Sequence, residues 1–297
     1  MTYINPRTNL KETTHEYYKI PLVHQKNINV LRLGGQKSAV HKVPINKKIS
    51  LDFYSRFSNS DELFVVFHGA NSDNNNFYPR FERVRSIKEK APSFLSIADP
   101  TMQIMDIPEM KLAWYLGGPD FDPMHSIAKV IRRAMGRTGA KHVAFIGGSG
   151  GGFAALRASS MWPNSLAFVQ DPQTNIANYY PQTLKKYFGN LWPGWDSKAL
   201  LEAFPERFDM VRYYSGFQPR NFVYYSQNET DLFHVENHYT PFAKVHGMES
   251  SVGSNSINNR YFALYKGERD GHGKITRDEF NSHFDSAVDF WRAHRLE

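Results

Sequence analysis

The stretch from residue 143 to residue 156 constrains the fold of this chain more than any other. It reads Val-Ala-Phe-Ile-Gly-Gly-Ser-Gly-Gly-Gly-Phe-Ala-Ala-Leu. The apolar run at 143–146 predicts a short, buried parallel strand, and the run at 153–161, rich in Ala, Leu and Met, predicts a helix. The glycines between them predict a sharp corner, because residues without side chains let a strand and a helix approach closely.

The corner carries a serine in a recognisable pattern. Gly147, Ser149 and Gly151 fit G-x-S-x-G, the nucleophile elbow. A serine on so tight a turn adopts a strained backbone conformation and holds its hydroxyl clear of the backbone. The amide of Gly150 then lies at a helix N-terminus, where developing negative charge is favoured. We therefore expect Ser149 to be a nucleophile and the Gly150 N–H to be an oxyanion donor.

Two other interpretations of the same glycines remain. The loop can simply turn the chain, or it can bind phosphate. The phosphate motifs fit poorly, because Phe153 stands where G-x-G-x-x-G needs its last glycine, and no lysine follows the glycines as in a P-loop.

A second turn follows the apolar run at 63–67. This run leads directly into His68-Gly69-Ala70-Asn71. An oxyanion hole needs a second backbone N–H from a loop that leaves a neighbouring strand. We assign that donor first to Ala70 and next to Asn71, and the alternative is an ordinary strand-to-helix turn.

The general base is expected late in the chain. A serine hydroxyl needs a base of near-neutral pKa, and imidazole supplies one. The chain has twelve histidines, and His272 stands out because it follows the last strand pattern, at 261–265. Gly271 and Gly273 flank it and would let the loop bring the ring to Ser149.

The base in turn needs a carboxylate to fix its tautomer. Asp231 is our first choice, because it follows the strand pattern at 221–225. Glu229 and Asp171 can fill the same role, and Asp231 can instead be a turn-forming or helix-capping residue.

A histidine pair close to Asp231 suggests a metal site. His234 and His238 are four residues apart and would share one face of a helix, a spacing that can hold zinc. Glu236 is one place too late for H-E-x-x-H, and no third ligand is evident. We therefore expect no metal and no cofactor.

Composition narrows the class of protein. The 297 residues are 41% hydrophobic and 14% aromatic, enough for a substantial core. There is no cysteine, no apolar signal-peptide segment at the N-terminus and no apolar run long enough to span a bilayer. We expect a cytoplasmic protein without a membrane span. The net charge of +7 is scattered rather than blocked, so we expect a solvated basic surface and no nucleic-acid partner.

The order of patterns predicts an α/β protein. From about residue 63 strand and helix patterns alternate, which favours a mostly parallel sheet with helices on both faces. We expect residues 61–297 to form the core and 1–60 to add strands to the same domain, after a frayed segment at 1–16. The aromatic-rich excursion at about 173–219 is too long for a plain connection. It suggests a lid for acyl chains or sugar rings, or aromatics that only pack it onto the core. Expected elements outside the site are strands at 17–22, 28–33, 39–43, 49–54, 94–98 and 166–169, and helices at 77–90, 127–135 and 239–245, with a capped helix after Thr276.

Together these motifs resemble the α/β-hydrolase superfamily. The resemblance rests on the order Ser149, Asp231, His272, on the elbow at 147–151 and on the His68-Gly69 turn, and it spans about residues 60–297. It implies an eight-stranded, mostly parallel sheet with an inserted cap, Ser149 as nucleophile, His272 as base, Asp231 as acid, and an oxyanion hole from the Gly150 and Ala70 amides.

The resemblance also implies an activity. It favours hydrolysis of a carboxylic ester, of a small molecule or a glycan, through an acyl-serine intermediate. Two alternatives remain. One is an O-acyltransferase, for example in glycan O-acetylation, and the other is a non-catalytic binding protein of the same fold.

Overall fold

The computed structural model describes residues 2–70, 78–104, 110–248, 255–257, 259–273 and 275–296. The chain divides into two compact units, residues 1–143 and 144–297. Every side chain that we assign to catalysis belongs to the second unit. Each unit is described separately below.

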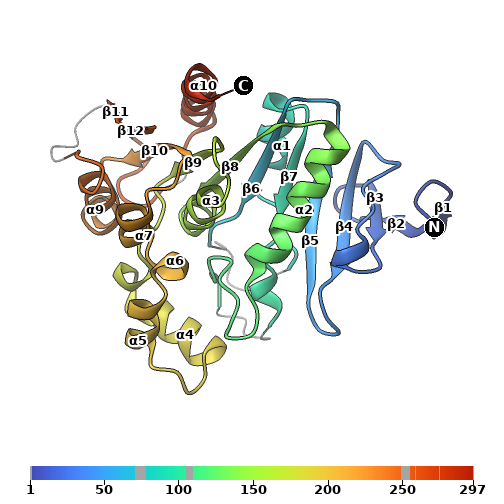
Figure 1. Cartoon of the computed structure of the whole chain (residues 1–297), viewed down its shortest axis with the longest axis horizontal. Coiled ribbons are helices and arrows are strands. Elements are labelled where there is room, and N and C mark those ends of the chain that lie inside the picture. The colour runs from blue at the N-terminus through green and yellow to red at the C-terminus, as the bar shows by residue number, and fades with distance from the viewer. Residues whose placement is uncertain are drawn as a thin grey trace. The chain divides into compact units, whose positions relative to one another are not determined.

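The first unit is built on a mixed sheet. Its strands run in the order β1-β2-β3-β4-β5-β7-β6, with parallel pairing at β3–β4 and at β6–β7 and antiparallel pairing elsewhere. Helix α2 (Pro123–Thr138), placed by the pattern at 127–135, packs beside β6 (Figure 1). The strand bounds are β1 Tyr3–Asn5, β2 Leu10–Thr14, β3 Pro21–His24, β4 Ser38–Pro44, β5 Ser50–Arg56, β6 Glu62–Phe67 and β7 Phe94–Ile97.

The N-terminal segment corrects one expectation. The segment expected to be frayed, residues 1–16, is ordered in its described part, because β1 and β2 form an antiparallel hairpin. A buried carboxylate holds it: Glu12 Oε1 accepts from Asn5 Nδ2 at 2.7 Å, and Glu12 Oε2 accepts from Gln36 Nε2 at 2.9 Å. The polar character of this segment predicts exposed side chains, whereas in the fold these side chains form hydrogen bonds with one another.

Three further expectations for this unit need correction. The strand expected at 17–22 begins only at Pro21, where β3 starts, because residues 16–18 form a turn. Residues 28–33 do not form a strand, because Asn27 caps a short 3₁₀ turn at Ile28–Val30 through its side-chain oxygen. The expected helix at 77–90 is only Val84–Lys90 (α1), since Arg83 before it adopts the left-handed conformation. Phe77 lies outside the described residues.

The second unit has the parallel sheet that the sequence predicts. Its strand order is β8-β9-β10-β12-β11, parallel from β8 to β12, with β11 antiparallel at the edge. Helices α3 (Gly150–Ser160) and α10 (Arg277–His294) lie on opposite sides of these strands (Figure 1). The strand bounds are β8 His142–Gly148, β9 Leu166–Gln170, β10 Phe222–Asn228, β11 Asn255–Ile257 and β12 Arg260–Tyr265.

The two units together exceed the expected strand count. The described residues form twelve strands rather than eight. The surplus includes strands as short as β1 and β11, which have three residues each. The α/β class and the parallel pairing around the elbow are as expected.

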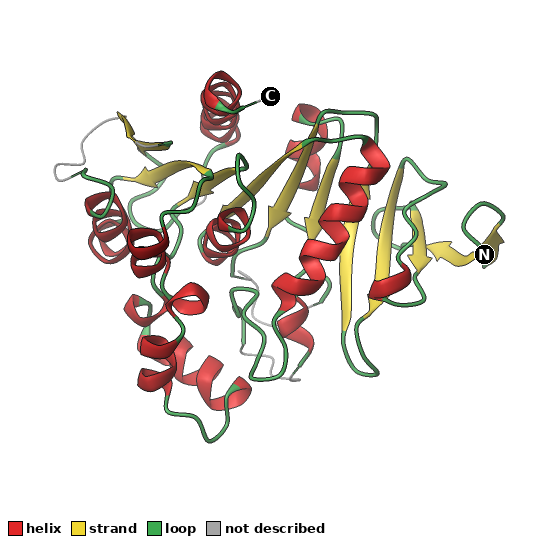
Figure 2. Ribbon diagram, in the orientation of Figure 1, coloured by secondary structure: helices red, strands yellow, loops and turns green. Residues whose placement is uncertain are grey.

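The long excursion after β9 is helical (Figure 2). It contains α4 (Pro181–Leu191), α5 (Ser197–Ala203), α6 (Pro205–Phe208) and α7 (Met210–Phe217). Several of its aromatic side chains are buried, among them Tyr187, Phe208 and Tyr214. Tyr214 joins the excursion to the rest of its unit, because its hydroxyl donates to the Leu156 carbonyl of α3 at 2.9 Å, whereas Phe208 packs on Phe188 and Trp192 within the excursion.

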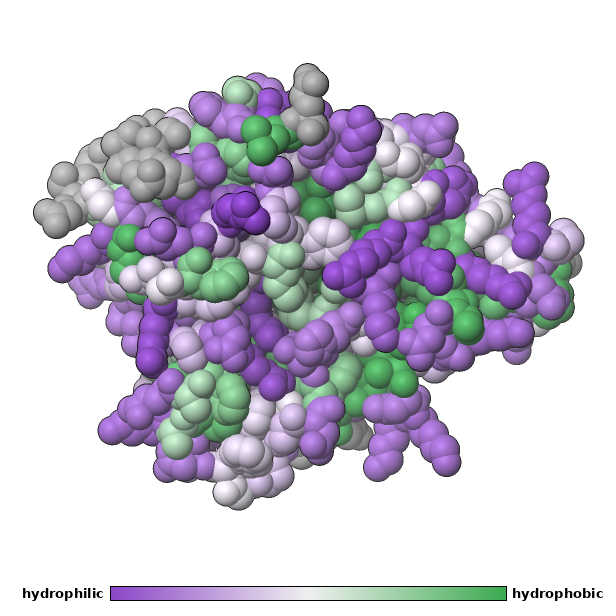
Figure 3. Space-filling model, in the orientation of Figure 1, coloured by the Kyte–Doolittle hydropathy of each residue, from purple (hydrophilic) through white to green (hydrophobic). Residues whose placement is uncertain are grey.

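The described residues contain no helix with the length and apolar character needed to cross a bilayer. On the face drawn in Figure 3, hydrophilic side chains are interspersed with the apolar ones.

One aromatic cluster should dominate the stability of the second unit. Phe168 on β9 is 1% exposed, and its ring centroid lies within 6.2 Å of the ring centroids of Tyr224, Phe280 and Phe284. We expect Phe168→Ala to lower the free energy of unfolding by about 3–5 kcal/mol, since it leaves a cavity in a packed core. Phe217→Ala is the matched control, because Phe217 is 66% exposed. Denaturant unfolding of both variants measures the difference, and equal losses would contradict this account.

Candidate active site

The elbow has the geometry that the glycines predict. Ser149 has φ 53° and ψ −124°, outside the ordinary regions for a residue with a side chain. A Cβ at Gly147 would lie 2.1 Å from the Gly151 carbonyl oxygen, and one at Gly152 would lie 2.5 Å from Pro172 Cβ. Only glycine fits at 147 and 152, so the strained serine depends on its neighbours having no side chains.

The loop that carries His272 is tied to the end of β10. Asn228 Nδ2 donates to the Gly271 carbonyl at 3.0 Å, and the Gly271 N–H donates to Thr230 Oγ1 at 3.3 Å. Gly271 has φ 82°, a conformation that glycine adopts without strain. Gly271 therefore has the role expected of a flanking glycine, because it lets the chain turn just before His272.

The structure brings Ser149, His272 and Asp231 together. His272 Nε2 lies 3.2 Å from Ser149 Oγ, and His272 Nδ1 lies 2.7 Å from Asp231 Oδ2. Asp231 is buried, whereas the His272 side chain is 36% exposed. A hydroxyl, an imidazole and a buried carboxylate are thus in series, in the arrangement that transfers a proton away from a serine.

Burial and neighbouring charges shift the pKa values of Asp231 and His272. Burial acts to raise the pKa of Asp231, but the close contacts with His234 and His272 hold it well below its usual range. Burial acts to lower the pKa of His272, but the hydrogen bond to Asp231 and the charges of Asp171 and Asp231 outweigh it. The net pKa of His272 is raised above its ordinary 6.5.

The two alternative carboxylates have other partners. Asp171 Oδ1 accepts from the Asn228 N–H at 2.6 Å and Oδ2 accepts from the Tyr265 hydroxyl, while burial raises the Asp171 pKa to about 6. Glu229 is exposed, 3.7 Å from Lys266 Nζ. Of the three candidates, Asp231 is the one placed at His272 Nδ1.

Two residues at the site, Gln173 and His234, were not predicted from the sequence to lie beside Ser149 and His272. Gln173 Nε2 donates to Ser149 Oγ at 2.9 Å and lies 3.0 Å from His234 Nε2. Gln173 follows β9 at its carboxyl end, so its position was a usable signal. The spacing of His234 and His238 suggests a zinc ligand, but the His234 ring stacks on His272 with centroids 4.2 Å apart and planes 13° from parallel.

A short α-helical turn, Leu232–His234 (α8), carries the second imidazole, and a π-helical turn follows it. Val235–Tyr239 has π-type hydrogen bonding, a local widening that is frequent at functional sites. Asp231 caps the preceding turn by accepting from the His234 N–H at 3.3 Å. Its role as a helix cap, the alternative to an acid role, is therefore real and coexists with the contact to His272.

The donor set near Asp231 is poorly arranged for a metal. One donor atom each from Asp231, His234 and His272 lies within 4.8 Å of the others. The nearly parallel rings of His234 and His272 cannot aim in-plane lone pairs at one tetrahedral ion. His238, the other member of the expected pair, accepts the Thr174 N–H on Nδ1 at 3.3 Å. The site fits hydrogen bonding better than zinc.

The candidate oxyanion donors lie in different units. Gly150 supplies the first amide of α3, one of the N–H groups that a helix leaves without an internal partner. In the first unit, His68 is buried and accepts the Asp99 N–H on Nε2 at 3.0 Å, which fixes the end of β6. Ala70 follows as an exposed residue, and Asn71 lies outside the described residues.

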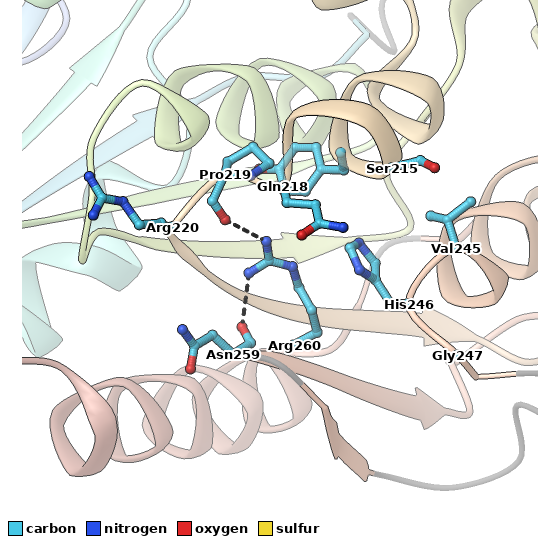
Figure 4. A pocket seen from close by; sticks show the side chains of 10 residues that line it. Ser215, Gln218, Pro219, Arg220, Val245, His246, Gly247, Asn259 and Arg260 are labelled. Atoms are coloured by element: carbon cyan, nitrogen blue, oxygen red, sulfur yellow. Dashed lines mark hydrogen bonds between the residues drawn. The ribbon is translucent and has the colours of Figure 1, made fainter.

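A separate pocket opens elsewhere on the second unit. It has a volume of about 880 Å³, and of the described residues that line it none belongs to the Ser149 site. Figure 4 shows the Arg260 guanidinium there, donating to the Pro219 carbonyl at 2.8 Å and to the Asn259 carbonyl at 3.2 Å. The bond to Pro219 ties the start of β12 to the segment that leads into β10, which is a structural role.

Known proteins resemble this chain in structure. No protein-family model and no curated protein sequence matches it. The capsule O-acetyltransferase of Neisseria meningitidis serogroup A aligns with a TM-score of 0.63 at 12% identity, over 88% of this chain and 99% of that one.

Two further solved structures also align with this chain over most of its length. The S-formylglutathione hydrolase from Agrobacterium tumefaciens aligns with a TM-score of 0.54 at 13% identity, over 89% of this chain and 98% of that one. A chain of the Glycosylation Associate Protein (Gap123) complex from Streptococcus agalactiae gives 0.52 at 15% identity, over 88% of this chain and 48% of that one. With the elbow and the parallel strands around it, these matches show that the chain has the α/β-hydrolase fold.

Proposed function

We propose that this protein is a serine esterase that cleaves a carboxylic ester through an acyl-serine intermediate. The observation that carries the proposal is the chain of contacts from Ser149 Oγ through the His272 ring to Asp231. Its neighbours in fold include a hydrolase and an O-acetyltransferase, enzymes that both handle acyl groups.

The proposed steps follow from this geometry. His272 Nε2 takes the hydroxyl proton as Ser149 Oγ bonds to the carbonyl carbon, and the negative charge moves to the carbonyl oxygen. The Gly150 N–H stabilises that charge, and Ala70 remains our sequence-based prediction for the second donor. The ester C–O bond then breaks, and His272 returns the proton to the departing alkoxide. Water attacks the acyl-serine by the same route in reverse.

A second function differs only in the acceptor. In an O-acyltransferase, a sugar hydroxyl replaces water as the group that attacks the acyl-serine. The similarity to a capsule O-acetyltransferase favours this candidate. Two aromatic rings near the site also favour it. Tyr180 and Phe233 stack with centroids 4.4 Å apart, Phe233 contacts the His234 ring, and Tyr180 is 44% exposed. Exposed aromatic faces are suited to sugar rings.

The nucleophile can be identified before any substrate is known. We expect a fluorophosphonate probe to modify Ser149, and Ser149→Ala to lose both labelling and turnover of p-nitrophenyl acetate while keeping the wild-type thermal transition. Peptide mapping locates the modified residue. An unlabelled wild-type protein, or activity retained by Ser149→Ala, would refute the proposal and favour a binding protein of this fold.

Adding an acceptor separates the two candidate activities. With p-nitrophenyl acetate as donor, mass spectrometry can compare free acetate with acetylated oligosaccharide at equal acceptor supply. Acetate as the main product supports the esterase, whereas acetylated sugar in excess supports the transferase.

The pH profile should report on the His272–Asp231 contact. A base works only when neutral, and the pKa of His272 is raised above 6.5, so activity should fall as the pH drops through that raised value. Asp231→Asn removes the contact that raises the pKa. We expect kcat/KM to fall by about 10⁴-fold and the acidic limb of the remaining activity to move to lower pH. Glu229→Gln, an exposed carboxylate beside Lys266, should match the wild type; an unshifted limb in Asp231→Asn would count against this assignment.

A further inference from the structure

Two buried side chains close a ring around the proposed catalytic trio. Gln173 and His234 are both 0% exposed. Gln173 Nε2 contacts Ser149 Oγ at 2.9 Å and His234 Nε2 at 3.0 Å. His234 Nδ1 lies 2.9 Å from Asp231 Oδ2, the oxygen that also faces His272. The contacts run from Ser149 through His272, Asp231, His234 and Gln173 and return to Ser149.

The carboxylate selects one tautomer of His234. At 2.9 Å from an ionised oxygen, a lone pair on Nδ1 would be repelled, whereas an N–H is attracted even though its direction is oblique to the oxygen. The neutral ring therefore carries its proton on Nδ1. Burial is the largest influence on the pKa of His234, and it outweighs the contact with Asp231, which acts to raise that pKa; the net pKa is lowered, which favours the neutral ring.

The tautomer of His234 then decides how Gln173 is turned. With the proton on Nδ1, His234 Nε2 is an acceptor and can pair only with the amide nitrogen of Gln173. Were His234 protonated on Nε2, the amide oxygen of Gln173 would face it instead. Because one end of the amide meets both His234 and Ser149, such a turn would also present an acceptor to the serine.

The orientation of Gln173 decides where the serine proton points. A hydroxyl has one proton and two lone pairs. An amide N–H that occupies a lone pair of Ser149 Oγ leaves the hydroxyl proton for His272 Nε2, 3.2 Å away. An amide oxygen in the same place would attract the hydroxyl proton and draw it away from the base.

We propose that Gln173 and His234 are positioning residues that direct the Ser149 hydroxyl proton toward His272. Asp231 then acts on the serine by two routes, directly through His272 and indirectly through His234 and Gln173. The proposal rests on the proposed function, because it assigns the direction of the proton that His272 removes.

The first test replaces the amide with a side chain of similar volume. We expect Gln173→Met to react with the fluorophosphonate probe about 10²-fold more slowly than the wild type, because the hydroxyl loses its fixed orientation. With p-nitrophenyl acetate the loss should fall on kcat and leave KM nearly unchanged. Gln173→Glu, which offers only acceptors when ionised, should be slower still. Circular dichroism and thermal unfolding check the fold of each variant.

A matched pair at His234 separates hydrogen bonding from packing. Glutamine and methionine have similar volumes, but only glutamine offers an oxygen that can accept from Gln173. We expect His234→Gln to label faster than His234→Met. His238→Met is the control, because His238 is buried on the next turn and its Nδ1 bonds to the Thr174 backbone. It should lose stability as His234→Met does, with a smaller loss of labelling rate.

Combining the substitutions tests whether the two residues act in series. If His234 works only through Gln173, the double variant His234→Met/Gln173→Met should label no more slowly than Gln173→Met alone. Additive losses, or equal rates for His234→Gln and His234→Met, would overturn the relay. So would a wild-type labelling rate in folded Gln173→Met. These outcomes differ from failure of the proposed function, in which the wild-type protein itself does not label at Ser149.

Discussion

The close approach of backbone to backbone at the elbow is the constraint on which the site depends. A Cβ at Gly147 would collide with the Gly151 carbonyl oxygen at 2.1 Å. Because that position has no side chain, α3 can begin directly beneath Ser149 and hold it at φ 53°. The strain of that conformation is carried by a parallel strand and a buried helix, which leave the serine no relaxed alternative.

Asp231 is the carboxylate around which the polar contacts of the site are arranged. Its carboxylate caps a helical turn, faces two imidazoles and is buried. A negative charge in such a place is tolerated because each contact favours the ionised form. The same charge holds one ring ready to accept a proton, while burial keeps the other ring neutral.

Much of this was readable from the sequence, and the reasons are local. The elbow, the strands on either side of it and the capping box at Thr276 and Glu279 are set by neighbours in the chain. Ser149, Asp231 and His272 could be picked out because each one follows its own apolar strand pattern by a few residues. The sequence places Asp231 first but leaves Asp171 as an alternative, because only the fold shows that Tyr265 and Asn228 are the hydrogen-bond partners of Asp171.

Where the sequence failed, long-range partners decided. Strands β1 and β2 pair around Glu12, which is buried against Asn5 on β1 and against Gln36, 24 residues further along the chain. His234 and His238 suggested zinc by their spacing, but Gln173 and the ring of His272, both far away in sequence, are the neighbours of His234 in the fold. Gln173 has no motif around it, and its contact with Ser149 exists only once β9 is paired with β8.

The end of β10 has a mechanical consequence for this site. The residues from Asn228 to Asp231 both tether the Gly271 loop and carry the carboxylate, so acid and base are fastened to one short piece of backbone. Breathing motions elsewhere would move the two together and preserve their spacing. Fraying of that single segment would release both at once, so the protein should lose activity in one cooperative event rather than by gradual loosening.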